Sequence, residues 1–315
     1  MNDSRQRWER CEIDPELLRH LSRRTNWHGL LYLAYFVGLL VGTGALAMAS
    51  VGTWWCIPAF FLYSSVWIFA TSVVHEASHR TAFKYRPLNE AVLFIFGFMV
   101  QQTPCLLRYS HARHHSHTAI VGDDPEILLN NPITWKDFVL IGVKSVWYFV
   151  KATALLAIHR PSKDAVAYIP VRKMPQARLE AQAYILAYLA IFGWSIATQS
   201  WLPVLMLLLP RIFGSLTHGV IMATQHIGLA QNIRDHRNTT RTMHLNPLLR
   251  VLYWNMNYHI EHHMYAQIPF HAMPALHRAV KKQCPEPTRG ILGVLREIAH
   301  TINRQRIDPF YSLPR

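Results

Sequence analysis

Three short boxes of histidines are the residues of this chain best suited to chemistry. They read His75-Glu76-Ala77-Ser78-His79, His111-Ala112-Arg113-His114-His115 and His259-Ile260-Glu261-His262-His263. Residues four apart on a helix lie on the same face, so His75 and His79 can bind one ion together. In the other two boxes, a spacing of three followed by a second histidine offers ligands in two directions, which suits two neighbouring ions.

Imidazole ligands without thiolates narrow the kind of metal site. Such ligands suit iron, zinc, copper or nickel. A catalytic zinc uses about three protein ligands and a water, so the eight boxed histidines are too many for one zinc ion. A site with two metals accounts for them most simply. The four cysteines form no Cys-x-x-Cys pair and no glycine-rich dinucleotide motif is present, so we expect electrons for redox chemistry to come from another protein.

Long uncharged stretches lie before or near these boxes. The chain has 315 residues, and no Asp, Glu, Lys or Arg occurs between Arg24 and Glu76. That length allows two membrane spans of about 20 residues each, divided by the turn-prone residues 50–53. A second apolar stretch follows Glu180 and is interrupted at residues 199–203. We therefore expect an all-α integral membrane protein with four transmembrane helices in two hairpins, at about residues 28–49, 53–74, 182–199 and 202–224.

Three features complicate this topology. Arg211 lies inside the fourth predicted span, where charged residues are rare. One role open to it is structural, such as pairing with a buried polar group or forming a kink beside Pro210. The other is a functional role near the substrate or metals. The apolar stretch 91–102 is short for a span and predicts a re-entrant or interfacial helix. Residues 138–158 are long enough, but two lysines interrupt them, so we predict an amphipathic helix on the membrane surface.

Basic residues predict the orientation. The net charge is +14, the first 27 residues carry six arginines, beginning with Arg5, and both hairpin tips lack Lys and Arg. Both termini and a helical cap that carries the boxes are therefore expected to be cytoplasmic. The expected organisation is an N-terminal segment 1–27, a membrane domain 28–280 and a cytoplasmic C-terminal tail 281–315. No nucleic-acid-binding motif accompanies the charge, which suits anionic lipid or an acidic partner protein instead.

The sequence resembles the membrane fatty acid desaturase and hydroxylase superfamily, whose HxxxH, HxxHH and HxxHH boxes stand here as HEASH, HARHH and HIEHH. The resemblance covers roughly residues 30–280 and includes the surroundings of the boxes, such as residues 122–126. It implies two iron ions in a non-haem centre that uses O2, with electrons from a ferredoxin, rubredoxin or cytochrome b5. The implied reaction is desaturation of an acyl or alkyl chain of a fatty acid or lipid. Hydroxylation, or a small specialised metabolite as substrate, stays open.

The resemblance also supplies a ninth ligand, His226, in the sequence Gln225-His226-Ile227-Gly228. Asn255, four residues before His259, is expected on the same helical face, where it could hold a water on one metal. Acidic residues near the boxes are expected to orient ligand imidazoles rather than to bind metal. The candidates are Glu76, Asp123, Asp124, Glu126, Asp235 and Glu261. Of these, Glu76, Asp124 and Glu261 are favoured. Isolated histidines such as His117 and His218 are expected not to bind metal.

Two other functions compete with this interpretation. Residues 75–79 read H-E-x-x-H, the helix of zinc proteases in which the glutamate is the general base. A protease with one zinc would leave both HxxHH boxes unexplained. Metal transport would place histidines along the spans, whereas these boxes follow the predicted span ends.

Overall fold

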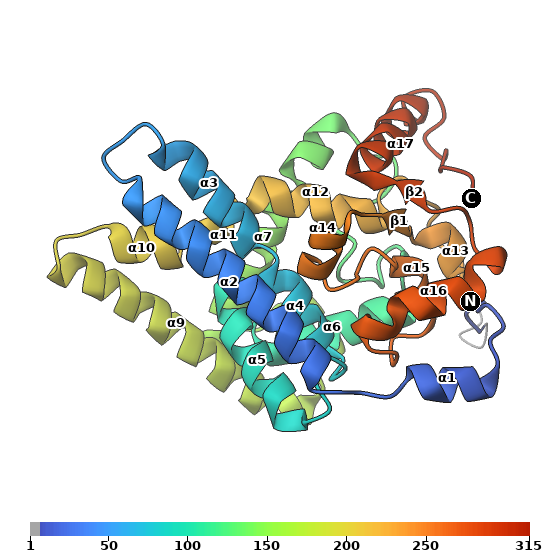
Figure 1. Cartoon of the computed structure of the whole chain (residues 1–315). Helices are drawn as coiled ribbons and strands as arrows, with labels where there is room; N and C mark the ends of the chain where they lie inside the picture. Colours follow the sequence, from blue (N-terminus) through green and yellow to red (C-terminus); the bar gives the residue numbers. More distant parts are fainter. Residues whose placement is uncertain (1–6) are drawn as a thin grey trace.

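The computed structural model describes residues 7–315 and is built almost entirely from α-helices (Figure 1). Strands in this part of the chain are limited to β1 (Met243–His244) and β2 (Thr288–Arg289), which pair in parallel. The predicted all-α class is therefore confirmed. Residues 1–6 of the predicted N-terminal segment, including Arg5, lie outside the described residues.

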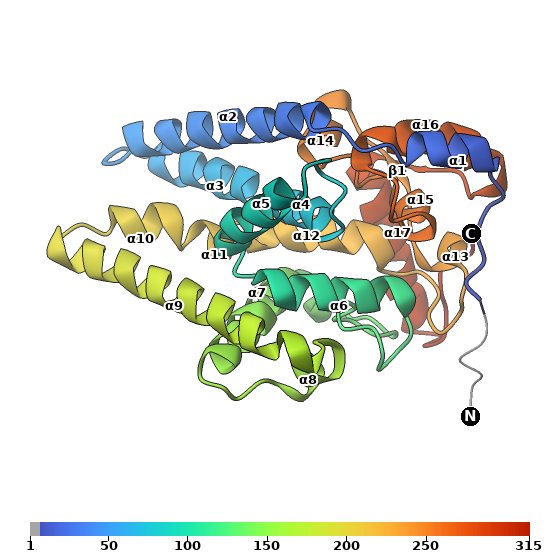
Figure 2. The same ribbon diagram turned by 90° about the horizontal axis from the view of Figure 1, so that it is seen from below.

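The first hairpin consists of α2 (Trp27–Ala49) beside a second apolar segment formed by α3 (Cys56–Trp67) and α4 (Ala70–Ser78) (Figures 1 and 2). These segments contain most of the predicted spans 28–49 and 53–74. The outward side chains of α2 are apolar: Leu31 is 51% exposed and Val41 is 64% exposed. Because a continuous apolar surface of this kind is costly in water, it is suited to contact with lipid.

The next two helices meet at a sharp bend. The axes of α5 (Arg86–Met99) and α6 (Pro104–Ser116) form an angle of 98°. Pro104 begins α6, a position where its missing N–H costs no helical hydrogen bond. The bend agrees with the re-entrant or interfacial segment expected at residues 91–102, and it directs α6, with the second histidine box, toward the first box.

Four apolar helical segments within residues 7–315 are long enough to cross a membrane. Besides the two segments of the first hairpin, they are α7 (Trp135–Ala157) and the segment formed by η1 (Val171–Lys173) and α9 (Met174–Ala197). The last segment contains most of the predicted third span. A helix was expected at residues 138–158 and is present as α7, and its placement on the membrane surface stays a prediction. The short helix α8 (Lys163–Tyr168) joins α7 to α9.

The fourth predicted span, residues 202–224, is not one continuous helix, and its crossing of the membrane stays a prediction. The segment is divided into α10 (Leu202–Leu207), α11 (Pro210–Phe213) and α12 (Ser215–His226). Pro210 cannot donate the backbone hydrogen bond that would continue α10. A side chain at Gly214 would meet the carbonyl oxygen of Ser64 at 2.4 Å, so only glycine permits this close approach to α3. The breaks leave Arg211 inside the bundle, fully buried.

Short helices form a cap at one end of the membrane helices, on the right of Figures 1 and 2. Its elements are α1 (Pro15–Leu21), α13 (His236–Thr239), α14 (Pro247–Leu252), α15 (His259–Met264), η2 (Phe270–Ala272), α16 (Met273–Val280), η3 (Lys281–Gln283) and α17 (Gly290–Gln305). The cap carries the third histidine box on α15.

The C-terminal segment is an integral part of this cap. Val294 and Ile298 of α17 belong to the main apolar core. Glu297 accepts a hydrogen bond from the buried Arg241 at 3.0 Å, which links α17 to the loop before β1. Residues 281–315, expected as a tail, therefore help to hold the cap together.

Candidate metal centre

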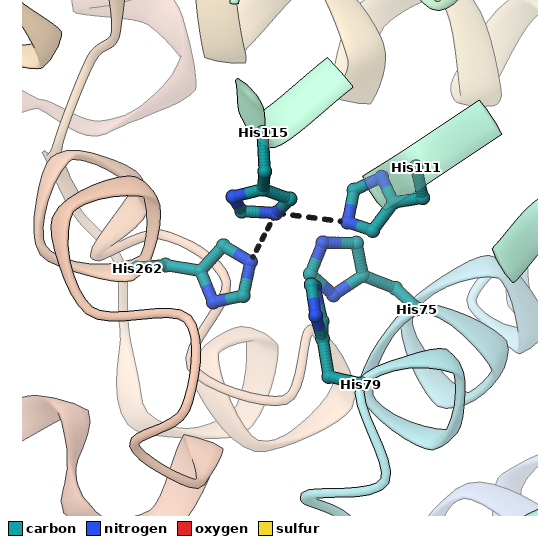
Figure 3. Close-up of side chains that lie close together, drawn as sticks. All are labelled: His75, His79, His111, His115 and His262. Atoms are coloured by element: carbon teal, nitrogen blue, oxygen red, sulfur yellow. Dashed lines mark hydrogen bonds between the residues drawn. The ribbon is translucent and has the colours of Figure 1, made fainter. Parts of the chain in front are cut away.

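The nine candidate ligands lie in two groups where α4, α6, α12 and α15 meet. The five-histidine group, shown in Figure 3, consists of His75, His79, His111, His115 and His262. The four-histidine group consists of His114, His226, His259 and His263. Within each group, one nitrogen of every ring lies within 4.8 Å of the corresponding nitrogens of the other rings.

Helical spacing explains how the boxes divide. In α6, His111 and His115 are four residues apart and share the five-histidine group, whereas His114 joins the four-histidine group. In α15, His259 and His263 belong to the four-histidine group, and only His262 joins the five-histidine group. His226, the last residue of α12, completes the four-histidine group. One helical turn thus contributes histidines to both groups, and their role as metal ligands stays a prediction.

The distances between imidazole nitrogens suit metal coordination. Two nitrogens bound to one ion at about 2.1 Å would be about 3.0–3.4 Å apart for ligand angles between octahedral and tetrahedral values. The observed Nε2–Nε2 distances are 3.1 Å for His115–His111, 3.1 Å for His115–His262, 3.2 Å for His259–His226 and 3.2 Å for His259–His263.

Unpartnered nitrogens provide a second test of whether a metal fits. The Nε2 atoms of His75 and His79 are buried, and neither has a hydrogen-bond partner in the part of the chain that the structure describes. A buried polar atom left in this state is costly. Figure 3 shows the rings of the five-histidine group turned toward a common centre. A bound ion would satisfy these nitrogens, so the residues present fit a metal.

The protonation state of the third box also suits a metal. Burial lowers the pKa of His259, His262 and His263 well below the usual imidazole value, and the neighbouring histidines lower it further. These rings are therefore neutral at pH 7, which is the form that binds metal ions.

Two carboxylates accept hydrogen bonds from the Nδ1 atoms of candidate ligand rings. Asp124 accepts from His114 Nδ1 at 2.8 Å, and Glu126 accepts from His111 Nδ1 at 2.8 Å. Burial opposes ionisation of both carboxyls, but the neighbouring histidines outweigh it and hold their pKa values below the usual range. These contacts fix the ring orientation and leave Nε2 for the metal.

Two threonines support the four-histidine group in a similar way. The carbonyl oxygen of Thr239 accepts a hydrogen bond from His226 Nδ1 at 2.9 Å. The hydroxyl group of Thr118 lies 3.1 Å from His263 Nδ1. Sequence reasoning missed both residues, because neither threonine is marked by type or spacing and one acts through its backbone.

Two of the favoured acidic residues lie differently from what was expected. Glu76 accepts a hydrogen bond from Thr81 at 2.8 Å, and its closest approach to His75 Nδ1 is 3.8 Å, too long for a hydrogen bond. Glu261 accepts from Nδ1 of His277, which belongs to neither group, at 2.5 Å. Of the three favoured carboxylates, Asp124 is the one that contacts a ligand ring as predicted, and Glu126 takes the corresponding place on His111.

Asn255 is also placed differently. It was expected to share a helical face with His259, but residues 253–257 form turns between α14 and α15, and Asn255 has a φ of 55°. Its amide group donates to the carbonyl oxygen of Phe270 at 3.0 Å. Its Oδ1 atom is buried without a partner among the described residues, so the proposed contact with a metal-bound water stays a prediction.

The isolated histidines stand outside both groups, as expected, within the described part of the chain. His236 has a packing role: its ring stacks on Trp8 with a centroid distance of 4.2 Å and lies 5.2 Å from the ring of His263.

A cavity of about 100 Å³ adjoins both groups. Its wall includes His75 of the five-histidine group and His226 of the four-histidine group. Apolar side chains of α7 and α12, including Ile141, Phe149 and Ile221, line it as well. A molecule in this cavity would meet both groups with apolar surface on its other sides, as an alkyl chain requires.

Comparisons with known proteins agree with this site. The chain matches the family model described as fatty acid desaturase over residues 52–291. It is 24% identical over 257 residues to the Delta(5) fatty acid desaturase fat-4 of Caenorhabditis elegans, covering 72% of this chain and 57% of that protein. It is 25% identical over 265 residues to the Delta(6)-fatty-acid desaturase fat-3 of the same organism, covering 74% and 59%.

A beta-carotene 4-ketolase of Protosiphon botryoides is 28% identical over 120 residues, covering 35% of this chain and 29% of that protein. The chain spans less than two thirds of the length of each of these relatives. The family match covers most of the chain, including all three histidine boxes, and the apolar helices indicate a multi-pass membrane protein. The chain therefore belongs to the fatty acid desaturase family.

Proposed function

We propose that the protein is an O2-dependent desaturase of an acyl or alkyl chain, with one iron ion in the five-histidine group and another in the four-histidine group. The observation that carries this proposal is the arrangement of two all-histidine groups around one cavity with apolar walls. Imidazole ligands suit iron, and the ligand count exceeds what a single catalytic zinc uses.

Each part of the site has a role in this proposal. When bound by these histidines, two iron ions would provide the O2-dependent oxidation that removal of hydrogen from an unactivated C–H bond requires. Asp124 and Glu126 orient His114 and His111 through their Nδ1 atoms. The apolar walls of the cavity position the alkyl chain and exclude water from the reacting carbon.

A separate redox protein, such as a ferredoxin, rubredoxin or cytochrome b5, is proposed to deliver the electrons. We place both termini and the cap on the cytoplasmic side, as the basic flanks favour. A basic surface lies close to the third box: Arg278, Lys281 and Lys282 are exposed, and His277 beside them contacts Glu261 of the box. An acidic electron donor could dock there by charge complementarity.

Membrane expression in a host with a reducing partner, followed by mass spectrometry of the lipids, tests the reaction. We expect new species lighter by two hydrogen atoms with the wild-type chain and none with His262→Ala. Lipids that remain unchanged, although iron is bound and reduced, would contradict lipid desaturation.

Oxygen insertion is a second candidate reaction, favoured by one observation. The beta-carotene 4-ketolase of Protosiphon botryoides aligns with part of this chain, and its name describes the addition of a keto oxygen to carbon. Products heavier by one oxygen atom in the same mass spectra would assign hydroxylation instead.

Neither of the other two functions accounts for the site as well. A zinc protease would use Glu76 as a base beside its metal, but the carboxylate hydrogen-bonds Thr81, and three further histidines surround His75 and His79. A transporter would need ligands in succession along a path, whereas the candidate ligands form two compact groups.

A further inference from the structure

Trp8 lies between the surface of the cap and the four-histidine group. Its indole ring stacks on the ring of His236, with a centroid distance of 4.2 Å and an angle of 4° between the planes. The ring of His236 lies 5.2 Å from that of His263, a member of the four-histidine group. Trp8 is partly exposed, whereas His236 and His263 are buried. Neighbouring aromatic rings thus connect the protein surface with a candidate metal ligand.

Hydrogen bonds hold the segment around Trp8 in place. The indole nitrogen of Trp8 donates to the carbonyl oxygen of Ser116 at 3.0 Å, at the end of α6. The backbone nitrogen of Glu9 donates to the carbonyl oxygen of Arg234 at 3.0 Å, and its carboxylate accepts from Arg237 of α13 at 2.5 Å. The indole ring is therefore fixed between α13 and α6, the helix that carries the second histidine box.

Helix α13 contacts the four-histidine group at two points. The carbonyl oxygen of Thr239 accepts a hydrogen bond from His226 Nδ1 at 2.9 Å, and the ring of His236 lies beside that of His263. His236 belongs to neither histidine group, so metal binding does not account for its buried ring. Its position between Trp8 and His263 suits a different role, which is to fill the space between the surface and the metal site with a conjugated ring.

The segment that contains Trp8 adjoins the basic surface near the third box. Glu12 and Gln283 exchange two hydrogen bonds, at 2.8 and 2.9 Å, which place this segment beside η3 (Figure 1). Four residues of extended chain span at most about 14 Å, so Trp8 is within reach of a protein docked on this surface. Arg7 and Arg10, on either side of Trp8 in the chain, are exposed. An acidic protein would complement the charge around Trp8.

We propose that electrons reach the metal centre through Trp8 and His236, from an acidic iron–sulfur or haem protein that docks over Trp8. Each electron tunnels from the donor, which is oxidised by one electron, to the ion held by the four-histidine group, which is reduced by one. Neither ring is oxidised or reduced, and no bond forms or breaks. This inference rests on the proposed function and adds the place where its electron donor docks.

Reduction kinetics under anaerobic conditions test this path. The full-length, iron-loaded protein in detergent is mixed in a stopped-flow instrument with a reduced plant-type ferredoxin, rubredoxin or cytochrome b5, and the absorbance of the donor reports its oxidation. Trp8→Leu and His236→Leu should each lower the rate constant at saturating donor several-fold, because tunnelling weakens exponentially across the gap that a missing ring leaves. Trp8→Phe keeps an aromatic ring and should restore most of the rate. Trp135→Leu is the matched control: Trp135 is 39% exposed, its ring packs on Phe138, and its loss should leave the rate unchanged.

Two further readouts do not depend on electron transfer. Trp8→Leu should keep the metal content of the wild type, because Trp8 contacts His236 rather than a candidate ligand. Arg7→Glu combined with Arg10→Glu should weaken the binding of the oxidised donor to the metal-free protein, as calorimetry would show, because the charges no longer match. Loss of iron from Trp8→Leu would show a structural role and overturn the proposal, and unchanged donor binding in the charge-reversal variant would overturn docking over Trp8.

The outcomes separate this inference from the proposed reaction. An unchanged rate of reduction in either Trp8→Leu or His236→Leu would overturn this path even if the enzyme desaturates lipids. A wild-type protein that dithionite reduces but none of the three donors reduces would overturn the proposed class of donor. Slower reduction in both variants of a protein that oxidises no lipid would support the path and contradict the proposed reaction.

Discussion

Asp124→Asn should weaken the binding of one metal ion and leave the binding of the other unchanged. The Asp124 side chain is 1% exposed and contacts His114 Nδ1 through both oxygens, at 2.8 and 2.9 Å. It also accepts backbone hydrogen bonds from Ala119 at 2.8 Å and from Glu126 at 2.9 Å. Asparagine keeps one acceptor oxygen for this loop but loses the negative charge that holds the His114 ring.

The size of the effect follows from this contact. Removing a hydrogen-bond partner of a ligand histidine costs about 10- to 100-fold in metal affinity, or about 1.4–2.8 kcal/mol. Because His114 belongs to the four-histidine group, that ion should be affected. Glu126→Gln should weaken the other ion by a similar factor, since Glu126 holds His111.

Competition with an iron chelator measures both affinities on the purified protein. Asp124→Asn should release one ion at a lower chelator concentration than the wild type, while the second ion is released as before. Asp123→Asn is the matched control, because Asp123 is the neighbouring residue, its side chain is 49% exposed and it pairs with Arg113. Wild-type release of both ions from Asp124→Asn would refute the reasoning, as would an equal loss in Asp123→Asn.

Three further predictions test other parts of the structure. His262→Ala should lose iron and activity but remain in the membrane, as fractionation and metal analysis would show, because His262 lies on α15 in the cap; full activity would argue against its role as a ligand. The sulfur atoms of Cys11 and Cys284 lie 3.4 Å apart, so mild oxidation should form a disulfide bond between them. Thiol counting should then show two thiols lost, and replacing either cysteine with serine should prevent the bond from forming. Replacing Arg278 and Lys282 with glutamate should slow reduction by an acidic donor in stopped-flow measurements, with metal content unchanged, and equal rates would exclude docking at this surface.

The helical period explains why most of the candidate site could be predicted from the sequence. Residues four apart share a face, so the division of His111, His114 and His115 between two groups follows from spacing alone. His226 needed the family resemblance as well, because a single histidine after an apolar stretch has no spacing partner.

The remaining features depend on how the loops fold. Glu126 reaches His111 because the loop after α6 turns back, whereas Glu76, although adjacent to the candidate ligand His75, accepts a hydrogen bond from Thr81. Asn255 does not lie on the same helical face as His259, because its backbone adopts a left-handed conformation. Residue types alone do not specify these conformations.

Contacts between residues far apart in the chain could not be predicted from the sequence either. Cys11 and Cys284 are 273 residues apart in the chain, and nothing in their sequence surroundings indicates that they meet. The helix break near Pro210 can be predicted from the proline. The complete burial of Arg211 depends on the helices packed around it, which the sequence does not specify.

The metal content of the purified protein tests the central claim most directly. Elemental analysis of protein isolated from membranes, after weakly bound ions are removed, should give about two iron ions per chain and little zinc. A single zinc ion per chain, or no tightly bound metal at all, would contradict the assignment of the two histidine groups as an iron centre.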